Sequence, residues 1–130
     1  PQEAELLQRL TAFYRDAGLT APAADELAAA WNEQPQRLRK LVRLLVDSGE
    51  LVQVDTELVM HRDAVAAGRR VVLSLFAGAG SFTTMDFRDA LGVSRKYAVP
   101  LLDYFDATRL TVRSGNRRTP GVMAKQGGGG

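Results

Sequence analysis

Residues 94–97 combine the side-chain types that bind phosphate at the start of a helix. Ser94 is a typical helix N-cap, and Arg95 and Lys96 place two cations beside the open amides of a first helical turn. Both the helix dipole and these N–H groups favour an anion. Tyr97 follows, where an aromatic ring could stack or hydrogen-bond at the rim. We therefore expect a nucleic-acid backbone to dock at this helix start.

A second basic segment lies near the C-terminus and reads Arg113-Ser114-Gly115-Asn116-Arg117-Arg118. Gly and Asn adopt left-handed backbone at little cost, which predicts a turn with an exposed tip. Three guanidinium groups would converge on that turn. Arginine forks match phosphate oxygens and guanine edges, and Asn can hydrogen-bond a base edge. The turn could therefore reach a groove or an unpaired base.

The charge distribution supports a polyanionic partner for this end of the chain. The net charge of +2 hides a difference between the halves. Residues 1–70 hold nine Lys/Arg and eleven Asp/Glu, a net charge of −2, whereas residues 71–130 hold eight and four, a net charge of +4. From Arg109 onward the chain carries four arginines and Lys125 but no Asp or Glu. A solvated basic tail without a ligand is the alternative.

Other kinds of chemistry have little support in the sequence. There is no Cys, and His61, which we expect at the surface or between domains, cannot form a metal cluster alone. Asp86 and Asp89 lie three apart on one predicted helix without a partner base, and no Walker-type phosphate loop is present. We therefore expect neither enzymatic activity nor a metal or cofactor in this segment.

The chain has the composition of a soluble globular protein. Apolar residues make up 45%, charged residues 25%, and no apolar run approaches the roughly 20 residues that span a bilayer. The start, Pro-Gln-Glu-Ala-Glu, has no Met and no signal-peptide pattern, so we expect a fragment of a longer protein. A cytoplasmic monomer without membrane association is the expectation.

The first half of the chain has the element order of a winged helix. Apolar spacing predicts helices over residues 3–17, 22–31 and 35–48. Alternation then predicts a hairpin of residues 51–54 and 58–60 around a two-residue turn at Asp55 and Thr56. Four cations on the third helix, Arg37, Arg39, Lys40 and Arg43, are expected to pair with Glu33, Asp47 and neighbouring acids.

The same order returns in the second half. A helix is predicted over residues 62–77, Thr84 is expected to cap a second one that ends at Gly92, and Ser94 a third over residues 95–106. Pro100 lies inside the third helix, so we expect a kink or a late start near residue 98. A strand over residues 110–112 then leads into the basic turn.

The two halves can be aligned as a repeat. Residues 45–52 lie over 104–111, and Leu27 and Trp31 lie over Phe87 and Leu91 after a one-residue gap. Coincidence among short apolar patterns is the alternative. The predicted fold is α+β, mainly α, with two tandem winged-helix domains of residues 1–62 and 63–122, followed by a flexible Gly-rich tail of residues 123–130.

Residues 85–106 and 108–117 resemble the last winged-helix domain of bacterial selenocysteine-specific elongation factors. His61 to Ala64 resemble the start of that domain, whereas residues 1–60 match in architecture and order. In that family, a GTPase portion similar to elongation factor Tu carries a C-terminal extension whose tip binds an mRNA hairpin, the selenocysteine insertion element. The resemblance implies RNA-binding roles for Arg88, Ser94, Arg95, Lys96, Tyr97, Arg109, Arg113, Ser114, Gly115, Asn116 and Arg117.

The resemblance also implies partners. The mRNA hairpin would be bound directly, and the ribosome and selenocysteyl-tRNA through the full-length protein, which delivers the tRNA at a UGA codon. GTP and magnesium would belong to domains that this sequence lacks, and the first winged helix would be a spacer and adaptor. A DNA-binding winged helix and a protein-interaction module are the alternatives.

Overall fold

The chain forms two compact units. The computed structural model describes residues 2–127, and the first unit runs to Val65 while the second begins at Ala66. In each unit, helices precede a β-hairpin. The mainly helical α+β class predicted from the sequence is confirmed.

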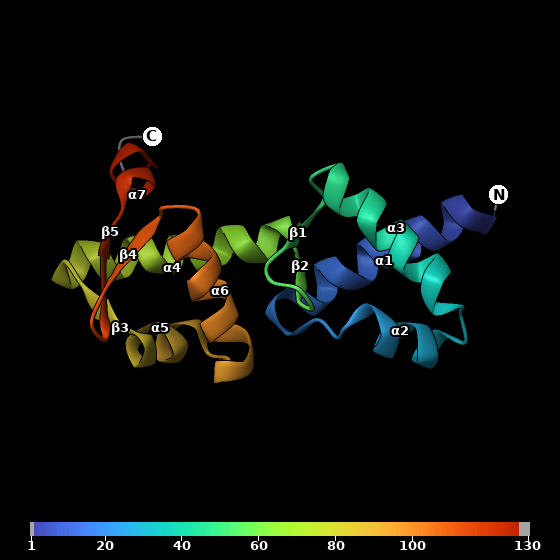
Figure 1. Ribbon diagram of the computed structural model, residues 1–130, viewed down its shortest axis with the longest axis horizontal. Helices are drawn as coiled ribbons and strands as arrows, with labels where there is room; N and C mark the ends of the chain where they lie inside the picture. Colours follow the sequence, from blue (N-terminus) through green and yellow to red (C-terminus); the bar gives the residue numbers. More distant parts are fainter. Residues whose placement is uncertain (1, 128–130) are drawn as a thin grey trace. The chain divides into compact units, whose positions relative to one another are not determined.

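Unit 1 follows the predicted order of helices and hairpin (Figure 1). Its elements are α1 (Gln2–Ala17), the 3-10 helix η1 (Gly18–Thr20), α2 (Ala24–Trp31), α3 (Pro35–Asp47), β1 (Leu51–Gln53) and β2 (Val59–His61). Pro35 occupies the first position of α3, where a missing amide costs no helical hydrogen bond. The core is formed by apolar side chains at three- and four-residue spacing, among them Leu6, Leu10, Tyr14, Leu27, Leu38, Leu41 and Leu45.

The turn between β1 and β2 is built by Asp55. Its Oδ1 accepts hydrogen bonds from the amides of Glu57 at 2.9 Å and Leu58 at 2.7 Å. The amide of Val54 donates to the carbonyl of Leu58 at 2.9 Å. The connection therefore spans residues 54–58, and the predicted two-residue turn is wrong. An Asp side chain that bonds its own backbone stabilises the wider loop.

His61 is fully buried, so a surface position, one of the two predicted for it, is wrong. Its Nε2 lies 2.6 Å from Glu50 Oε2, and its Nδ1 accepts the amide hydrogen of Asp63 at 3.0 Å. The ring therefore serves as N-cap of the helix that starts at Arg62, while a carboxylate satisfies its other nitrogen.

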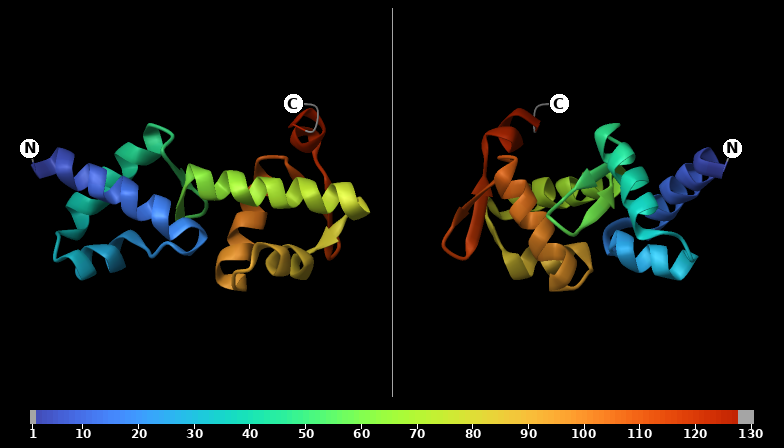
Figure 2. Two further views of the ribbon diagram at one scale, coloured as in Figure 1. Left: turned by 180° about the vertical axis from the view of Figure 1, so that it is seen from behind. Right: turned by 45° about the vertical axis from the view of Figure 1, so that its right-hand side comes forward.

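Unit 2 has a three-stranded sheet beside its helices (Figure 2). The elements are α4 (Arg62–Ala79), which begins at the end of unit 1, β3 (Phe82–Thr83), α5 (Thr84–Leu91), α6 (Arg95–Ala107), β4 (Thr111–Ser114), β5 (Arg117–Pro120) and α7 (Val122–Gly127). β5 is the central strand and pairs antiparallel with both β3 and β4. The short strand β3 was not predicted from the sequence, because two residues carry no alternation.

Aromatic rings fill the core of unit 2. Phe82 lies 5.0 Å from Phe76 and 6.1 Å from Phe87 between ring centroids, and Phe87 lies 6.3 Å from Phe105. Gly68 allows α4 to approach α6 closely, since a Cβ there would lie 2.8 Å from Leu101 Cδ2. This core fixes α5 and α6 against α4.

The two units share one buried pattern at a constant spacing of 60 residues. Phe87, Leu101 and Phe105 are buried at the positions that Leu27, Leu41 and Leu45 occupy in unit 1. The left-handed residues that end the helices keep the same spacing, Asn32 with Gly92 and Gly49 with Arg109. The predicted alignment of residues 45–52 is therefore shifted by one residue, and no gap is needed.

Two local predictions in unit 2 need correction. Thr83, not Thr84, caps α5: its Oγ accepts the amide of Asp86 at 3.1 Å, and the Asp86 carboxylate accepts the amide of Thr83 at 2.9 Å. α6 begins at Arg95 and continues through Pro100. The late start near residue 98 is wrong, because tertiary packing of α6 outweighs one missing helical hydrogen bond.

The tail predicted from residue 123 begins as helix α7 instead. The amide of Met123 donates to the carbonyl of Arg109 at 2.9 Å, and Ala124 is buried. Gly121 precedes the helix in close contact with the backbone of Arg109, where a Cβ would have no room. Residues 128–130 of the predicted tail lie outside the described residues.

Candidate nucleic-acid interface

The start of α6 presents cations and open amides to solvent. Ser94 occupies the N-cap position with extended backbone, and its carbonyl accepts the amides of Tyr97 at 3.1 Å and Ala98 at 3.0 Å. Its side chain makes no capping hydrogen bond, contrary to the predicted capping role. Ser94, Arg95 and Lys96 are exposed. The hydroxyl and the first-turn amides can therefore meet an anion that the helix dipole favours.

Tyr97 lies at the edge of this basic helix start. It is half-buried, and Lys96 Nζ lies 5.4 Å from the centroid of its ring. Neither Arg95 nor Lys96 forms an ion pair with an acid among residues 2–127. A phosphate would therefore not have to displace a carboxylate from these two cations.

The tip of the β4–β5 hairpin is the second cationic surface. Gly115 has a φ of +63°, as the predicted turn requires, and residues 112–117 are all exposed. Arg113 Nε donates to the carbonyl of Gly115 at 3.2 Å, and Arg117 Nε donates to Ser81 Oγ at 2.9 Å. Both guanidinium groups are thus oriented by neutral acceptors and retain donors for phosphate.

Arg117 also contributes to the electrostatics at the start of α5. Hydrogen bonds from the backbone and side chain of Thr83 hold the pKa of Asp86 below its ordinary value, and the charge of Arg117 lowers it further. Asp86 is therefore a carboxylate at neutral pH.

Arg118 is not part of the exposed cluster, so the predicted convergence of three wing arginines is wrong. Its side chain is buried and pairs with Asp106, with Nη2 2.9 Å from Oδ2. Alternation along β5 turns Arg117 outward and Arg118 inward. Strand periodicity was the signal that could have revealed this difference.

Arg109 and Arg113 line a shallow hollow of about 350 Å³ at the base of the hairpin. Exposed Val112 and Val122 provide apolar surface there. Arg109 has a φ of +68°, a conformation that costs a side-chain-bearing residue roughly 1–2 kcal/mol. Unit 1 has Gly49 at the equivalent position.

The predicted site residues fall into separate places on unit 2. The start of α6 and the hairpin tip lie toward the same side in the views of Figures 1 and 2, at the two ends of α5. α5 has eight residues, so its ends are roughly 12 Å apart. Arg88 lies on α5 and bonds Asp89 Oδ1 at 3.0 Å. Arg109 follows the other end of α6, away from Ser94, and shares the hollow with Arg113.

Unit 1 has a different electrostatic surface at the corresponding positions. Its hairpin carries Asp55 and Glu57. The predicted ion pairs of α3 are confirmed for its arginines but not for Lys40: Arg37 pairs with Glu33 at 3.7 Å and Arg43 with Asp47 at 3.3 Å. Arg39 pairs with Asp25 at 2.7 Å, whereas Lys40 is exposed and has no ion pair within residues 2–127.

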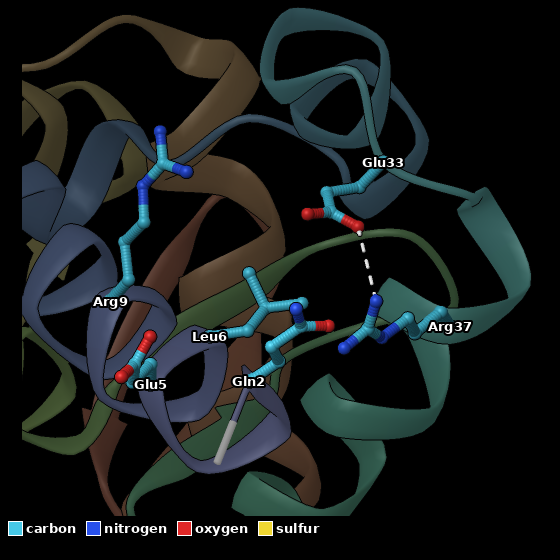
Figure 3. A pocket seen from close by; sticks show the side chains of 6 residues that line it. All are labelled: Gln2, Glu5, Leu6, Arg9, Glu33 and Arg37. Carbon is cyan, nitrogen blue, oxygen red and sulfur yellow. Dashed lines mark ion pairs between the residues drawn. The ribbon is translucent and has the colours of Figure 1, made fainter.

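A hollow of about 380 Å³ lies between α1 and the start of α3 in unit 1 (Figure 3). Glu33 and Arg37 line one side of it and form the ion pair described above. Arg9, on the other side, has its guanidinium carbon 3.8 Å from the centre of the Trp31 ring. Both cations of this hollow are thus already engaged, Arg37 by a carboxylate and Arg9 by an aromatic ring.

The described part of the chain offers no metal site and no membrane span. Over residues 2–127, no group of His, Asp and Glu side chains is arranged to hold a metal ion. No helix in the same range has the length and apolarity needed to cross a membrane.

These features define a class: a winged-helix protein whose second unit carries a cationic helix start and hairpin tip. Residues 74–119 match the family described as elongation factor SelB, winged helix. A selenocysteine-specific elongation factor of Desulfomicrobium baculatum is 30% identical over 81% of this chain, and one of Escherichia coli K12 is 31% identical over 70%. The chain spans 17% and 15% of the lengths of these two relatives.

Two solved structures have a similar fold. The mRNA-binding domain of E. coli elongation factor SelB, solved in complex with SECIS RNA, matches with a TM-score of 0.71 and 28% identity, over 76% of this chain and 82% of that one. A bacterial selenocysteine-specific elongation factor has the same fold over 88% of this chain and 18% of its own, with a TM-score of 0.70 and 21% identity. The chain thus corresponds to the C-terminal winged-helix part of selenocysteine-specific elongation factors.

Proposed function

We propose that unit 2 binds an mRNA hairpin, the selenocysteine insertion element, and thereby tethers a longer elongation factor for selenocysteine incorporation at UGA. The observation that carries this proposal is the contrast between the units. Arg95, Lys96 and Arg113 have no acidic partner within residues 2–127, whereas the arginines on α3 of unit 1 are paired with acids. The similar E. coli domain was solved with SECIS RNA, which supports the same ligand.

The proposed contacts follow from chemistry and position. Ser94, Arg95 and Lys96 bind phosphates at the α6 start, and Tyr97 stacks or hydrogen-bonds beside them. At the hairpin and its base, a second set of contacts comes from Arg109, Arg113, Ser114, Gly115, Asn116 and Arg117, with Arg88 on the intervening α5. RNA duplexes hide their base edges in a deep narrow groove, so backbone contacts and a few unpaired bases carry the recognition.

The remaining activities belong to the longer protein. We propose that GTP, magnesium, selenocysteyl-tRNA and the ribosome are bound through that protein, and that this chain is a binding region and not an enzyme. The spacer and adaptor role of unit 1 remains a prediction.

The rival nucleic acid is duplex DNA, with α6 in a major groove. Two features of α6 disfavour it. Asp103 is exposed in the middle of the helix and would face phosphates or base acceptors, and Tyr104 is partly buried. The rival without nucleic acid is a protein-interaction module, which the variants below separate from RNA binding.

The test is a binding titration by fluorescence anisotropy over a range of salt concentrations. The probes are a labelled selenoprotein mRNA hairpin from the organism that encodes this chain and a DNA duplex of equal length. We expect tighter binding to the hairpin, with a linear fall of log affinity against log salt. Equal or tighter binding of the DNA duplex contradicts the proposal.

The double variant Arg95→Gln/Arg113→Gln locates the contacts. It should weaken RNA binding and reduce the slope of the salt plot by roughly 0.7–0.9 for each phosphate that is no longer neutralised. Arg39→Gln/Arg43→Gln in unit 1 is the matched control, because it removes the same charge from exposed arginines that are paired with acids. No effect of either double variant would support the protein-interaction alternative, whereas equal effects would show that the RNA contacts are not confined to unit 2.

A further inference from the structure

Arg118 is the buried cation that the RNA site does not use. It lies on the central strand β5, with 3% of its surface exposed. Its Nε lies 3.2 Å from each carboxylate oxygen of Asp106, and its Nη2 lies 2.9 Å from Oδ2. This is a bidentate arginine–carboxylate pair, which fixes the relative orientation of the two side chains as well as their distance.

The pair extends to the neighbouring elements. Arg118 Nη1 donates to Thr84 Oγ at the start of α5 at 3.2 Å, and Nη2 lies 3.6 Å from Asp103 on α6. The hydroxyl of Thr111 on β4 donates to Asp106 Oδ1. Arg118 thus connects β5 with α5 and α6, and Asp106 connects α6 with β4; these elements carry both proposed RNA-binding surfaces.

Unit 1 shows that a winged helix can do without this polar cluster. At the spacing of 60 residues, Asp106, Thr111 and Thr84 correspond to Val46, Leu51 and Ala24. Gln53 and Arg113 are also 60 residues apart. Arg118 pairs with Arg113 in unit 2, and Val59 pairs with Gln53 in unit 1, so Val59 is the counterpart of Arg118. These four positions are polar in unit 2 and apolar in unit 1, whereas the more distant Asp103 corresponds to Arg43.

The energetics make this difference informative. A buried ion pair gains little net stability over apolar side chains of similar volume, because two charges must be desolvated. Stability alone therefore does not account for the polar cluster of unit 2. Its distinctive property is geometry, since the guanidinium group of Arg118 on β5 bonds both α5 and α6, and its paired hydrogen bonds with Asp106 allow one arrangement of the β4–β5 hairpin and α6.

We propose that Arg118 and Asp106 are positioning residues for RNA binding, an inference that rests on the proposed function. They hold the β4–β5 hairpin at a set position relative to α5 and α6. Arg113 and Arg117 on the β4–β5 hairpin and Arg95 on α6 then contact phosphates of one mRNA hairpin simultaneously. Arg118 itself does not touch the RNA.

The main test replaces the cluster by apolar groups of similar volume, as Asp106→Leu/Thr111→Val/Arg118→Met. The change removes one positive and one negative charge, so the net charge of the chain is unchanged. We expect a folded variant whose affinity for the mRNA hairpin is lower by roughly 2- to 30-fold, the range for substitutions that act without touching the ligand. The slope against salt should stay at the wild-type value, because the same phosphates remain neutralised.

Two outcomes would overturn the inference. A folded triple variant that binds RNA within twofold of the wild type shows that the cluster is only structural. A smaller salt slope shows that Arg118 contacts phosphate directly. If the triple variant does not fold, Arg118→Lys decides, because lysine keeps the charge and loses the fork. Wild-type affinity of Arg118→Lys would then overturn the inference.

Amide hydrogen exchange of residues 113–117 separates this inference from the proposed function. We expect faster exchange at the hairpin in Arg118→Lys, with the exchange of α4 unchanged. Failure of the wild-type chain to bind the hairpin RNA would contradict the proposed function, whereas faster exchange in Arg118→Lys would still show that Arg118 holds the β4–β5 hairpin. Unchanged exchange at residues 113–117 would sink the positioning role, whatever the RNA affinity.

Discussion

Alanine at Gly68 and at Gly78 should have opposite effects, although both glycines lie in α4. A Cβ at Gly68 would lie 2.8 Å from Leu101 Cδ2 and 3.4 Å from Phe105 Cζ, whereas a Cβ at Gly78 meets nothing within 4 Å. Carbon atoms pack comfortably at about 3.5–4.0 Å, so Leu101 would have to retreat by roughly 0.7 Å or more. The clash falls on α6, the helix whose start carries the proposed RNA contacts.

The magnitudes follow from two opposing effects. Replacing Gly by Ala inside a helix stabilises it by about 0.8–1 kcal/mol, while overpacking a core costs about 1–3 kcal/mol. Gly78→Ala should therefore stabilise unit 2 by up to about 1 kcal/mol. Gly68→Ala should change its stability by between about 0 and −2 kcal/mol. Both variants gain the same stabilisation of the helix. The difference between their free energies of unfolding therefore gives the cost of the clash, about 1–3 kcal/mol.

Thermal unfolding followed by far-ultraviolet circular dichroism measures this difference. For a unit of this size, 1 kcal/mol shifts the midpoint by about 4–8 °C. Trp31, the single tryptophan of the chain, lies in unit 1, and its fluorescence provides an internal control for that unit. A midpoint for Gly68→Ala equal to or above that of Gly78→Ala would refute the close approach of α4 and α6.

Further predictions concern the pair of His61 and Glu50, a helix cap and an arginine with left-handed backbone. The hydrogen bond from His61, and then the charges of Arg62 and Arg15, hold the pKa of Glu50 below its ordinary value of 4.5, against the opposing effect of burial. The resulting stability is present above that value and lost as pH falls through the folded-state pKa. Glu50→Gln should therefore be less stable than the wild type in urea at neutral pH, with a gap that closes in acid; a gap independent of pH contradicts the pairing. Thr83→Ala removes the capping box of α5 and should cost about 1 kcal/mol in the same assay, whereas no loss would show that the cap is dispensable. Arg109→Gly relieves the left-handed backbone but adds entropy to the unfolded chain, so stability should rise by at most about 1 kcal/mol. Its RNA affinity should fall at the same time; unchanged affinity would remove Arg109 from the proposed site.

Much of the fold could be predicted from local patterns. Apolar residues at three- and four-residue spacing indicated the helices of both units, and the spacing of Leu27 and Phe87 already indicated the repeat. Gly115 marked the hairpin tip because a left-handed residue is needed there. These signals act within a few residues, so they can be read without knowing the partners in space. The strand β3 and helix α7 gave no such signal.

The sequence by itself determined the order of elements, the basic character of unit 2 and the exposed positions of Ser94 to Lys96 and of the hairpin tip. Only the tertiary structure showed that one of the hairpin cations is buried. Arg117 and Arg118 are adjacent and chemically identical, yet one is exposed and the other is buried against Asp106. His61 similarly became a buried helix cap because Glu50 lies next to it in space. The physical reason is that an ion pair depends on two groups brought together from distant positions, and burial depends on everything packed around them.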